Sequence, residues 1–162
     1  MSKAPEPTAR LSVLDRLLDD GSGDAGSATW LGSVEALKAS LVRDLEWLLN
    51  SRRIVEPAPP EFPEVRNSVY HFGIPDISSR SADSLTEQQG LSRDIEEAVR
   101  IFEPRLTDVR VVVRPSTEKG ARLARFVIEA LLRMEPNPER VVFDTVLDRP
   151  TGEFSVTGDL DA

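Results

Sequence analysis

A chain of 162 residues is long enough to bury one hydrophobic core, so we expect a single domain with short extensions. Its 28 acidic and 20 basic residues give a net charge of −8, which argues against a nucleic-acid-binding surface, since such surfaces are normally basic. The lack of cysteine excludes disulfides and thiolate metal sites. No signal peptide and no apolar run of roughly 20 residues that could span a bilayer is visible, so we expect a cytoplasmic protein.

The N-terminal region is predicted to hold three short segments. Residues 1–9 are polar and expected to be disordered, residues 10–20 form a short amphipathic helix, and the glycine- and serine-rich residues 21–32 form a flexible linker. A tethered helix of this kind either folds back on its own domain or docks in a partner's groove, and the sequence leaves both open. The apolar side chains of this helix include Leu14, Leu17 and Leu18.

The main domain is expected over residues 33–158, before a tail at 159–162. Ser33 is a plausible N-cap for a helix that ends near Arg52 and Arg53, where basic residues suit the negative helix end. Trp47 lies off the apolar stripe and is either a core edge or a contact surface, the core being the commoner case. The stripe, spaced three or four residues apart, consists of Val34, Leu37, Leu41, Leu45 and Leu48.

A proline-rich stretch then leads into a short helix predicted from Glu64 to Phe72. Pro63 opens this helix and Gly73 ends it as the residue after the C-cap. His71, the only histidine in the chain, lies on it. A lone histidine here is more often a structural hydrogen-bonding group than a catalytic base.

A second long helix is predicted over residues 83–102, and Ser92 could cap the run that leads to Phe102. Pro104 cannot continue a helix, so the chain must turn there. Glu103 and Arg105 therefore flank a rigid corner with opposite charges. On physical grounds alone, a local ion pair is the commoner interpretation, and a contact between Arg105 and a partner's carboxylate is the alternative.

Strands are expected in the remainder of the chain. Residues 109–113 are rich in valine, residues 122–134 alternate with a period of two, and residues 141–147 and 154–156 flank a turn at Thr151 and Gly152. The predicted fold class is therefore α+β, with two main helices plus a short helix packed on a small antiparallel C-terminal sheet.

The sequence gives little support for enzymatic activity, and we expect no catalytic residue, cofactor or metal ion. A glycosidase needs two carboxylates across a cleft, but Asp44 and Glu46 lie two residues apart on a helix and point in different directions. Gly21 and Gly23 follow a helix, which is the wrong context for a dinucleotide-binding loop. We expect no small-molecule substrate.

Three motifs in fixed order carry a family resemblance. They are DLEWLLNSRR at residues 44–53, SVYHFGIPD at residues 68–76 and IEEAVRIFEPRL at residues 95–106. Together they closely resemble the TssE family, the lysozyme-like wedge subunits of the type VI secretion system baseplate, a family similar to the wedge protein of contractile phage tails. The resemblance covers roughly residues 33–156, and residues 11–18 also look like the family's N-terminal segment.

The resemblance implies a structural role in a contractile injection system, without hydrolase activity. Such subunits lie in the wedge beside TssF and TssG, with TssK nearby, connect to the first ring of the TssB–TssC sheath, and help sheath assembly to begin at the inner-membrane-docked baseplate. The family's Glu-Pro-Arg motif maps onto Glu103, Pro104 and Arg105, and implies that this corner holds the wedge core together.

Two further hypotheses concern protein–protein contacts. The N-terminal helix clips onto a wedge partner, and an exposed edge of the sheet, offered by residues 141–147 or 154–156, accepts a strand from the sheath. A stand-alone adaptor or regulator of the same fold is the alternative function. The predicted partner-interface residues are Glu103, Pro104, Arg105, Arg52, Arg53, Leu14, Leu17, Leu18, Val141, Phe143, Phe154 and Val156.

Overall fold

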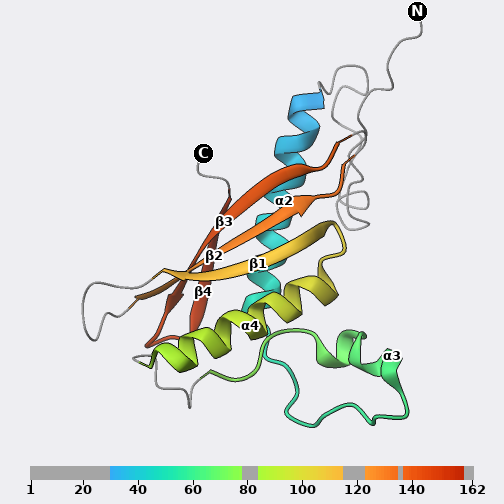
Figure 1. Cartoon of the computed structure of the whole chain (residues 1–162), viewed down its shortest axis with the longest axis vertical. Coiled ribbons are helices and arrows are strands. Elements are labelled where there is room, and N and C mark those ends of the chain that lie inside the picture. Colours follow the sequence, from blue (N-terminus) through green and yellow to red (C-terminus); the bar gives the residue numbers. More distant parts are fainter. Residues whose placement is uncertain (1–29, 78–83, 115–122, 135–136, 159–162) are drawn as a thin grey trace, which may run out of the picture.

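The computed structural model describes residues 30–77, 84–114, 123–134 and 137–158. The predicted N-terminal tail, docking helix and linker lie outside these residues, as does the tail at 159–162. Within them, the chain forms two long helices, two short helical turns and one four-stranded sheet (Figure 1). None of the described helices is long and apolar enough to cross a membrane.

The two long helices are α2, Trp30–Asn50, and α4, Leu85–Phe102. Helix α2 begins at Trp30, so the prediction that Ser33 caps it is wrong. Ser92 likewise lies inside α4, where its hydroxyl donates to the carbonyl of Gln89 at 2.9 Å, and it caps nothing. A serine inside a helix can bond back to the preceding turn instead of capping a helix start, as Ser92 does.

The single helix predicted from Glu64 to Phe72 is two separate turns, α3 at Pro63–Arg66 and η1 at Val69–His71. The break occurs at Ser68, whose backbone is extended and whose hydroxyl accepts a hydrogen bond from the amide of Tyr70 at 3.2 Å. A serine side chain that satisfies a backbone amide in this way starts a new turn and ends the old one. Gly73 has φ of 103°, as expected for the residue that stops the second turn.

The C-terminal half of the chain is a meander of four antiparallel strands in the order β1-β2-β3-β4. Their bounds are Leu106–Arg114, Leu123–Leu132, Glu139–Asp148 and Glu153–Gly158. This confirms the α+β fold and the four strands, including the alternating segment that became β2. Strand β1 begins earlier than predicted and its register shifts between Thr107 and Arg110, beside Asp108 with φ of 51°.

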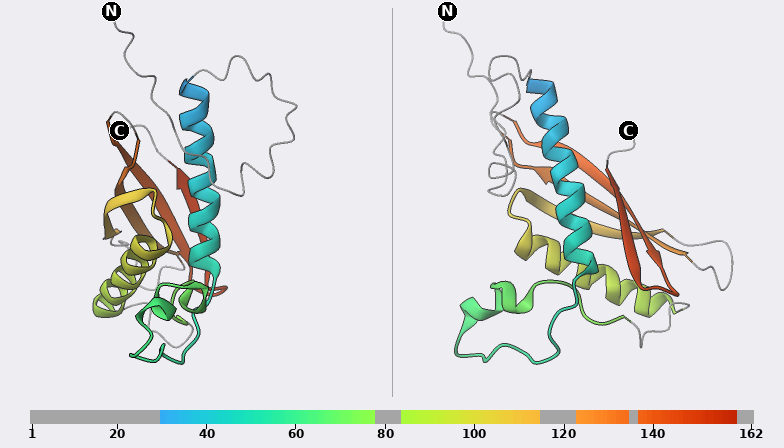
Figure 2. Two further views of the ribbon diagram at one scale, coloured as in Figure 1. Left: turned by 90° about the vertical axis from the view of Figure 1, so that its right-hand side faces the viewer. Right: turned by 180° about the vertical axis from the view of Figure 1, so that it is seen from behind.

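The core lies between the helices and one face of the sheet. Helix α4 runs along β1, and α2 runs along β4 on the far side of the molecule (Figures 1 and 2). Trp47 is 61% exposed, so of its two alternatives the commoner one, a position at the edge of the core, is wrong. The buried side chains include the whole predicted stripe of α2, Ile95 and Val99 of α4, and Phe126, Phe143 and Phe154 of the sheet.

Thr145 in β3 is a polar residue buried in this core. Its side chain is fully buried, and its hydroxyl has no hydrogen-bond partner among the described residues. Because an unsatisfied buried hydroxyl costs free energy, Thr145→Val should raise the free energy of unfolding by about 1 kcal/mol in urea denaturation. The exposed Thr157→Val should change it by less than about 0.5 kcal/mol. A less stable Thr145→Val variant would contradict this prediction.

The segment between α2 and α4 forms an arm that projects from the body, with α3 near its tip (Figure 1). Its two ends meet where Arg52 and Ile74 form a parallel bridge. The rings of Phe72 and Phe102 meet edge to face, with their centroids 5.2 Å apart. Arg66 forms a salt bridge with Glu97 of α4, with 2.6 Å between Nη2 and Oε1. Beyond these contacts, the arm exposes large apolar side chains, namely Val55, Phe62 and Val69.

Candidate partner interface

The corner after α4 is fixed first by its own backbone. Glu103 is the C-cap, and its amide donates to the carbonyl of Val99 at 2.9 Å. Its carbonyl then accepts from the amide of Leu106 at 3.1 Å, so the chain turns within a few residues. Pro104, between these two bonds, is exposed and prevents the helix from continuing. The carbonyl of Arg105 already accepts from the amide of Arg133, which lies just beyond the end of β2.

The side chain of Arg105 points into the molecule and makes two charged contacts. Its Nε and Nη2 donate to the two carboxylate oxygens of Glu103, at 2.6 and 2.5 Å. Nη2 also donates to Oδ2 of Asp44 at 2.6 Å, and Nη1 donates to the hydroxyl of Ser40 at 3.0 Å. Three nitrogens of the guanidinium are thus bonded to the corner and to α2. We call Ser40, Asp44, Glu103 and Arg105 the Arg105 cluster.

The Arg105 cluster is largely removed from water. The side chain of Arg105 is 17% exposed and that of Glu103 only 6%. Burial on its own lowers the pKa of Arg105, but the hydrogen bonds and negative charges of Glu103 and Asp44 outweigh it and raise this pKa above its usual range. The guanidinium is therefore held in its charged form, as a fixed joint between α2, α4 and β1.

This arrangement is the local ion pair that physical reasoning favoured, extended to a second helix. A salt bridge from Arg43 to Oδ1 of Asp44 at 2.9 Å continues the network toward the surface. Contact between the corner and a partner stays a prediction, for which exposed Pro104 offers the outer face. The sequence did not single out Ser40 or Asp44 as partners of Arg105. Their only signal is the spacing of four residues, which places both on one face of α2.

The other predicted basic residues lie at the end of α2. Arg52 donates to the carbonyl of Leu49 at 3.2 Å and to that of Gly152 at 2.7 Å, which ties the helix end to the β3–β4 turn. The amide of Arg53 donates to the carbonyl of Ile74 at 2.8 Å. The guanidinium of Arg53 makes no hydrogen bond or ion pair with the part of the chain that the structure describes.

The predicted sheet-edge residues have two different positions. Strand β3 pairs with β2 along its whole length and with β4 over residues 143–148. The prediction of an exposed edge is therefore wrong for residues 143–147, whereas residues 141 and 142 have no partner strand on the β4 side among the described residues. Val141 and Phe143 are 1% exposed and pack in the core. Strand β4 is an edge strand, although Phe154 and Val156 also point into the core. Leu14, Leu17 and Leu18 lie outside the described residues, and their contact with a partner stays a prediction.

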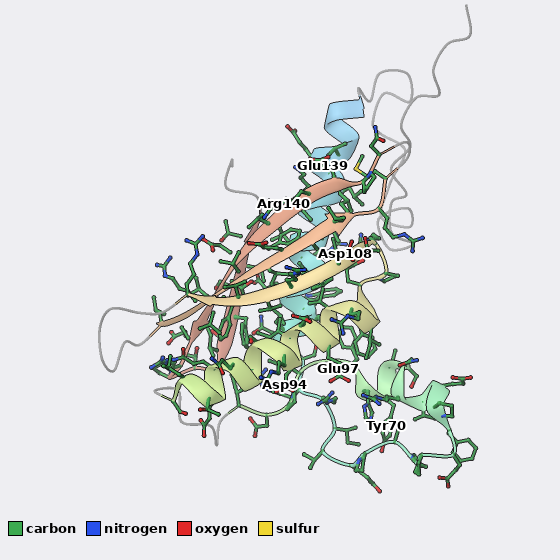
Figure 3. The ribbon with its side chains drawn as sticks, in the orientation of Figure 1. Tyr70, Asp94, Glu97, Asp108, Glu139 and Arg140 are labelled. Carbon is green, nitrogen blue, oxygen red and sulfur yellow. The ribbon has the colours of Figure 1, made fainter. Side chains whose placement is uncertain are left out.

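Asp44 and Glu46 have separate structural roles. Asp44 binds Arg105, whereas Oε2 of Glu46 accepts a hydrogen bond from the amide of Val156 at 3.3 Å. They point in different directions, as predicted. His71 is a hydrogen-bonding residue of the arm, where Nε2 accepts from the amide of Ala58 at 3.1 Å. Its ring stacks on that of Tyr70, with the ring centroids 5.4 Å apart; Figure 3 labels Tyr70 on the arm. The described residues contain no cluster of histidine and carboxylate side chains that could hold a metal ion.

Comparisons with known proteins identify the family of this chain. The model of the family described as baseplate wedge protein gp25 matches residues 35–137. Among solved structures, a chain described as "The baseplate complex from the type VI secretion system" is similar at 16% identity and a TM-score of 0.46. The match covers 68% of this chain and 97% of that chain. No curated protein matches the sequence.

Proposed function

Because the chain belongs to the gp25 family of baseplate wedge proteins, we propose that it is a structural subunit of a type VI secretion baseplate wedge. The family match over residues 35–137 carries the proposal. The matched span contains all three motifs on which the resemblance to the TssE family rests, including the end of α2 and the corner at residues 103–105. The subunit works by binding proteins and not by catalysis, in the cytoplasm at the baseplate docked on the inner membrane.

In this proposal the subunit contacts TssF and TssG, lies near TssK, and bridges the wedge to the first ring of the TssB–TssC sheath, which helps sheath assembly to begin. A subunit that joins two assemblies has to keep its surfaces in a fixed relative position. The Arg105 cluster supports such a role, because it ties α2 to the start of β1 through charged hydrogen bonds of 2.6 Å.

Co-purification tests the proposal directly. A tagged chain expressed with the wedge and sheath subunits should retain TssF and TssG on the affinity resin. Omission of the chain should leave less sheath bound to the wedge. If the chain retains no wedge subunit when all partners are present and folded, the proposed function is wrong and the adaptor alternative gains support.

Arg53 provides a residue-level test of the wedge contact. Arg53 is half-buried, and its guanidinium makes no ion pair with the described residues, so it is available to a carboxylate of a partner. Arg53→Ala should weaken the binding of wedge subunits in co-purification about tenfold or more, because loss of one charged interface contact costs roughly 2 kcal/mol of binding free energy. The melting temperature of the variant should stay unchanged. The matched control is Arg93→Ala, an exposed arginine of α4. Equal binding by both variants would remove Arg53 from the interface.

A further inference from the structure

A cavity of about 350 Å³ opens where the start of α4 meets strand β2 and the turn between β3 and β4. Figure 1 shows the start of α4 beside the ends of β3 and β4. The apolar side chains that line the cavity are at most 6% exposed and belong to the core, namely Leu91, Ala124, Phe126 and Leu147. A hollow of this size with an apolar lining can take one large apolar group.

The charged side chains that line this cavity balance one another. They are two arginines, Arg52 and Arg149, and two carboxylates, Asp76 and Glu87. An ion that entered the cavity would be attracted by one pair and repelled by the other, whereas a neutral group meets no such conflict. The lining therefore favours a neutral ligand over a charged one.

One carboxylate oxygen of the lining lacks a hydrogen-bond donor. Oε2 of Glu87 is shielded from solvent and accepts no hydrogen bond, and the carboxylate forms no ion pair with the part of the chain that the structure describes. Its position in the first turn of α4 is favourable for a negative charge, but supplies no hydrogen bond to this oxygen. Because a buried acceptor without a donor costs free energy, a ligand that brings an N–H group would recover that cost.

The segment of the chain next to the cavity has no side chain that matches it. Residues 78–83 lie outside the described residues, between Ile77, which lines the cavity, and the helix that carries Glu87. Their sequence contains no apolar side chain larger than that of Ala82. Arg80 has an aliphatic stem, but it would add a positive charge to a lining whose charges already balance. The complementary occupant is therefore a group of another molecule.

We propose that this cavity binds one large apolar residue of a partner's peptide. The side chain of that residue packs on the buried apolar lining, and its backbone amide donates a hydrogen bond to Oε2 of Glu87. A peptide group is neutral, as the balanced charges require, and it brings the missing donor. An apolar anchor in a desolvated pocket is the usual centre of a protein–protein contact. The site is measured on the isolated full chain, so its failure would leave the proposed wedge function untouched.

A titration with N-acetylphenylalanine methyl ester tests the apolar part of the site, because this probe has an aromatic side chain, no charge and a single N–H group. It should shift the amide resonances of Leu91, Ala124 and Leu147 in the isotope-labelled chain, with a dissociation constant of about 1 mM. N-acetylglycine methyl ester, which lacks the side chain, should bind at least about tenfold more weakly. Equal binding of the two probes, or no saturable shift at these residues, would overturn the proposal.

A comparison of two probes on two chains tests the hydrogen bond to Glu87. N-methylation of the phenylalanine probe removes its N–H group, and should weaken binding about fivefold in the wild type but less than about twofold in Glu87→Ala. Glu35→Ala, the same change at an exposed position of α2, is the control and should keep the fivefold effect. An equal effect of N-methylation in the wild type and Glu87→Ala would overturn the proposal.

Arg80→Ala tests the competing occupant from the chain itself. This variant should bind the phenylalanine probe as the wild type does, because the cavity is free for a partner's residue. Binding at least about fivefold tighter than in the wild type would show that Arg80 competes for the cavity, and would overturn the assignment of the site to a partner.

Discussion

Arg105→Ala should lower the free energy of unfolding by about 3 kcal/mol, because it leaves two carboxylates without their shared cation. Glu103 is 5% exposed and cannot regain full hydration, and Asp44 keeps only its bond to Arg43. The figure is at the low end for a buried ion pair, since Arg105 retains some exposure. In a chain of this size the loss corresponds to a fall of about 10 °C in the melting temperature, measurable by circular dichroism.

An exposed arginine gives the matched control for this prediction. Arg140 pairs with Glu129 at 3.1 Å on the surface of the sheet. Surface pairs contribute little, so Arg140→Ala should cost less than about 1 kcal/mol. Arg105→Lys should fall between the two variants, because an ammonium group can neutralise the carboxylates but cannot fork between Glu103, Asp44 and Ser40.

The same experiment separates the two readings of the Glu-Pro-Arg corner. If Arg105→Ala melts well below the wild type, any loss of wedge binding is a consequence of the lost joint between α2 and the corner. If it melts like the wild type and still loses wedge binding, the internal contacts contribute little and Arg105 acts on a partner. A melting temperature within about 2 °C of the wild type would thus contradict the structural role of the cluster.

The predictions that held depend on local chemistry. The spacing of leucines three and four apart located α2, and Pro104 fixed the point where α4 ends, since both signals act within one turn of helix. The alternation of residues 122–134 located β2 for the same reason, because the period of two belongs to the strand itself. The resemblance on three motifs likewise agrees with the family match over residues 35–137.

The contacts of the candidate site that were missed join distant segments. Asp44 reaches Arg105 across 61 positions, and Asn50 reaches Phe154 across 104. Among 28 acidic residues, no sequence signal selects Asp44. The internal position of β3 could have been predicted from the sequence. Consecutive antiparallel strands joined by short turns usually pair with their neighbours, which leaves only the first and last strands at the edges of the sheet. Trp47 was misplaced because an apolar side chain off the stripe has no obligatory environment.

Gly73→Ala should have an effect of similar size to Arg105→Ala, about 3 kcal/mol of lost stability, for a purely steric reason. Gly73 has φ of 103°, where a residue with a side chain is strained by about 1–3 kcal/mol. A Cβ here would also lie 2.3 Å from the carbonyl oxygen of Ser51. That oxygen accepts from the amide of Ile74 at 3.0 Å, in the bridge that joins the two ends of the arm. The bridge must open to admit the methyl group.

The consequence reaches the core because Ile74 is fully buried there. Opening the bridge would withdraw Ile74 from its contacts and release the backbone of Arg53, the predicted interface residue. Gly90→Ala is the matched control, since the same methyl group in the interior of α4 should stabilise the chain by about 0.5–1 kcal/mol. Thermal melts should therefore shift in opposite directions for the two variants. Equal stability of Gly73→Ala and the wild type would show that the arm can rearrange without the bridge, and would leave Arg53 without a fixed position at the proposed wedge contact.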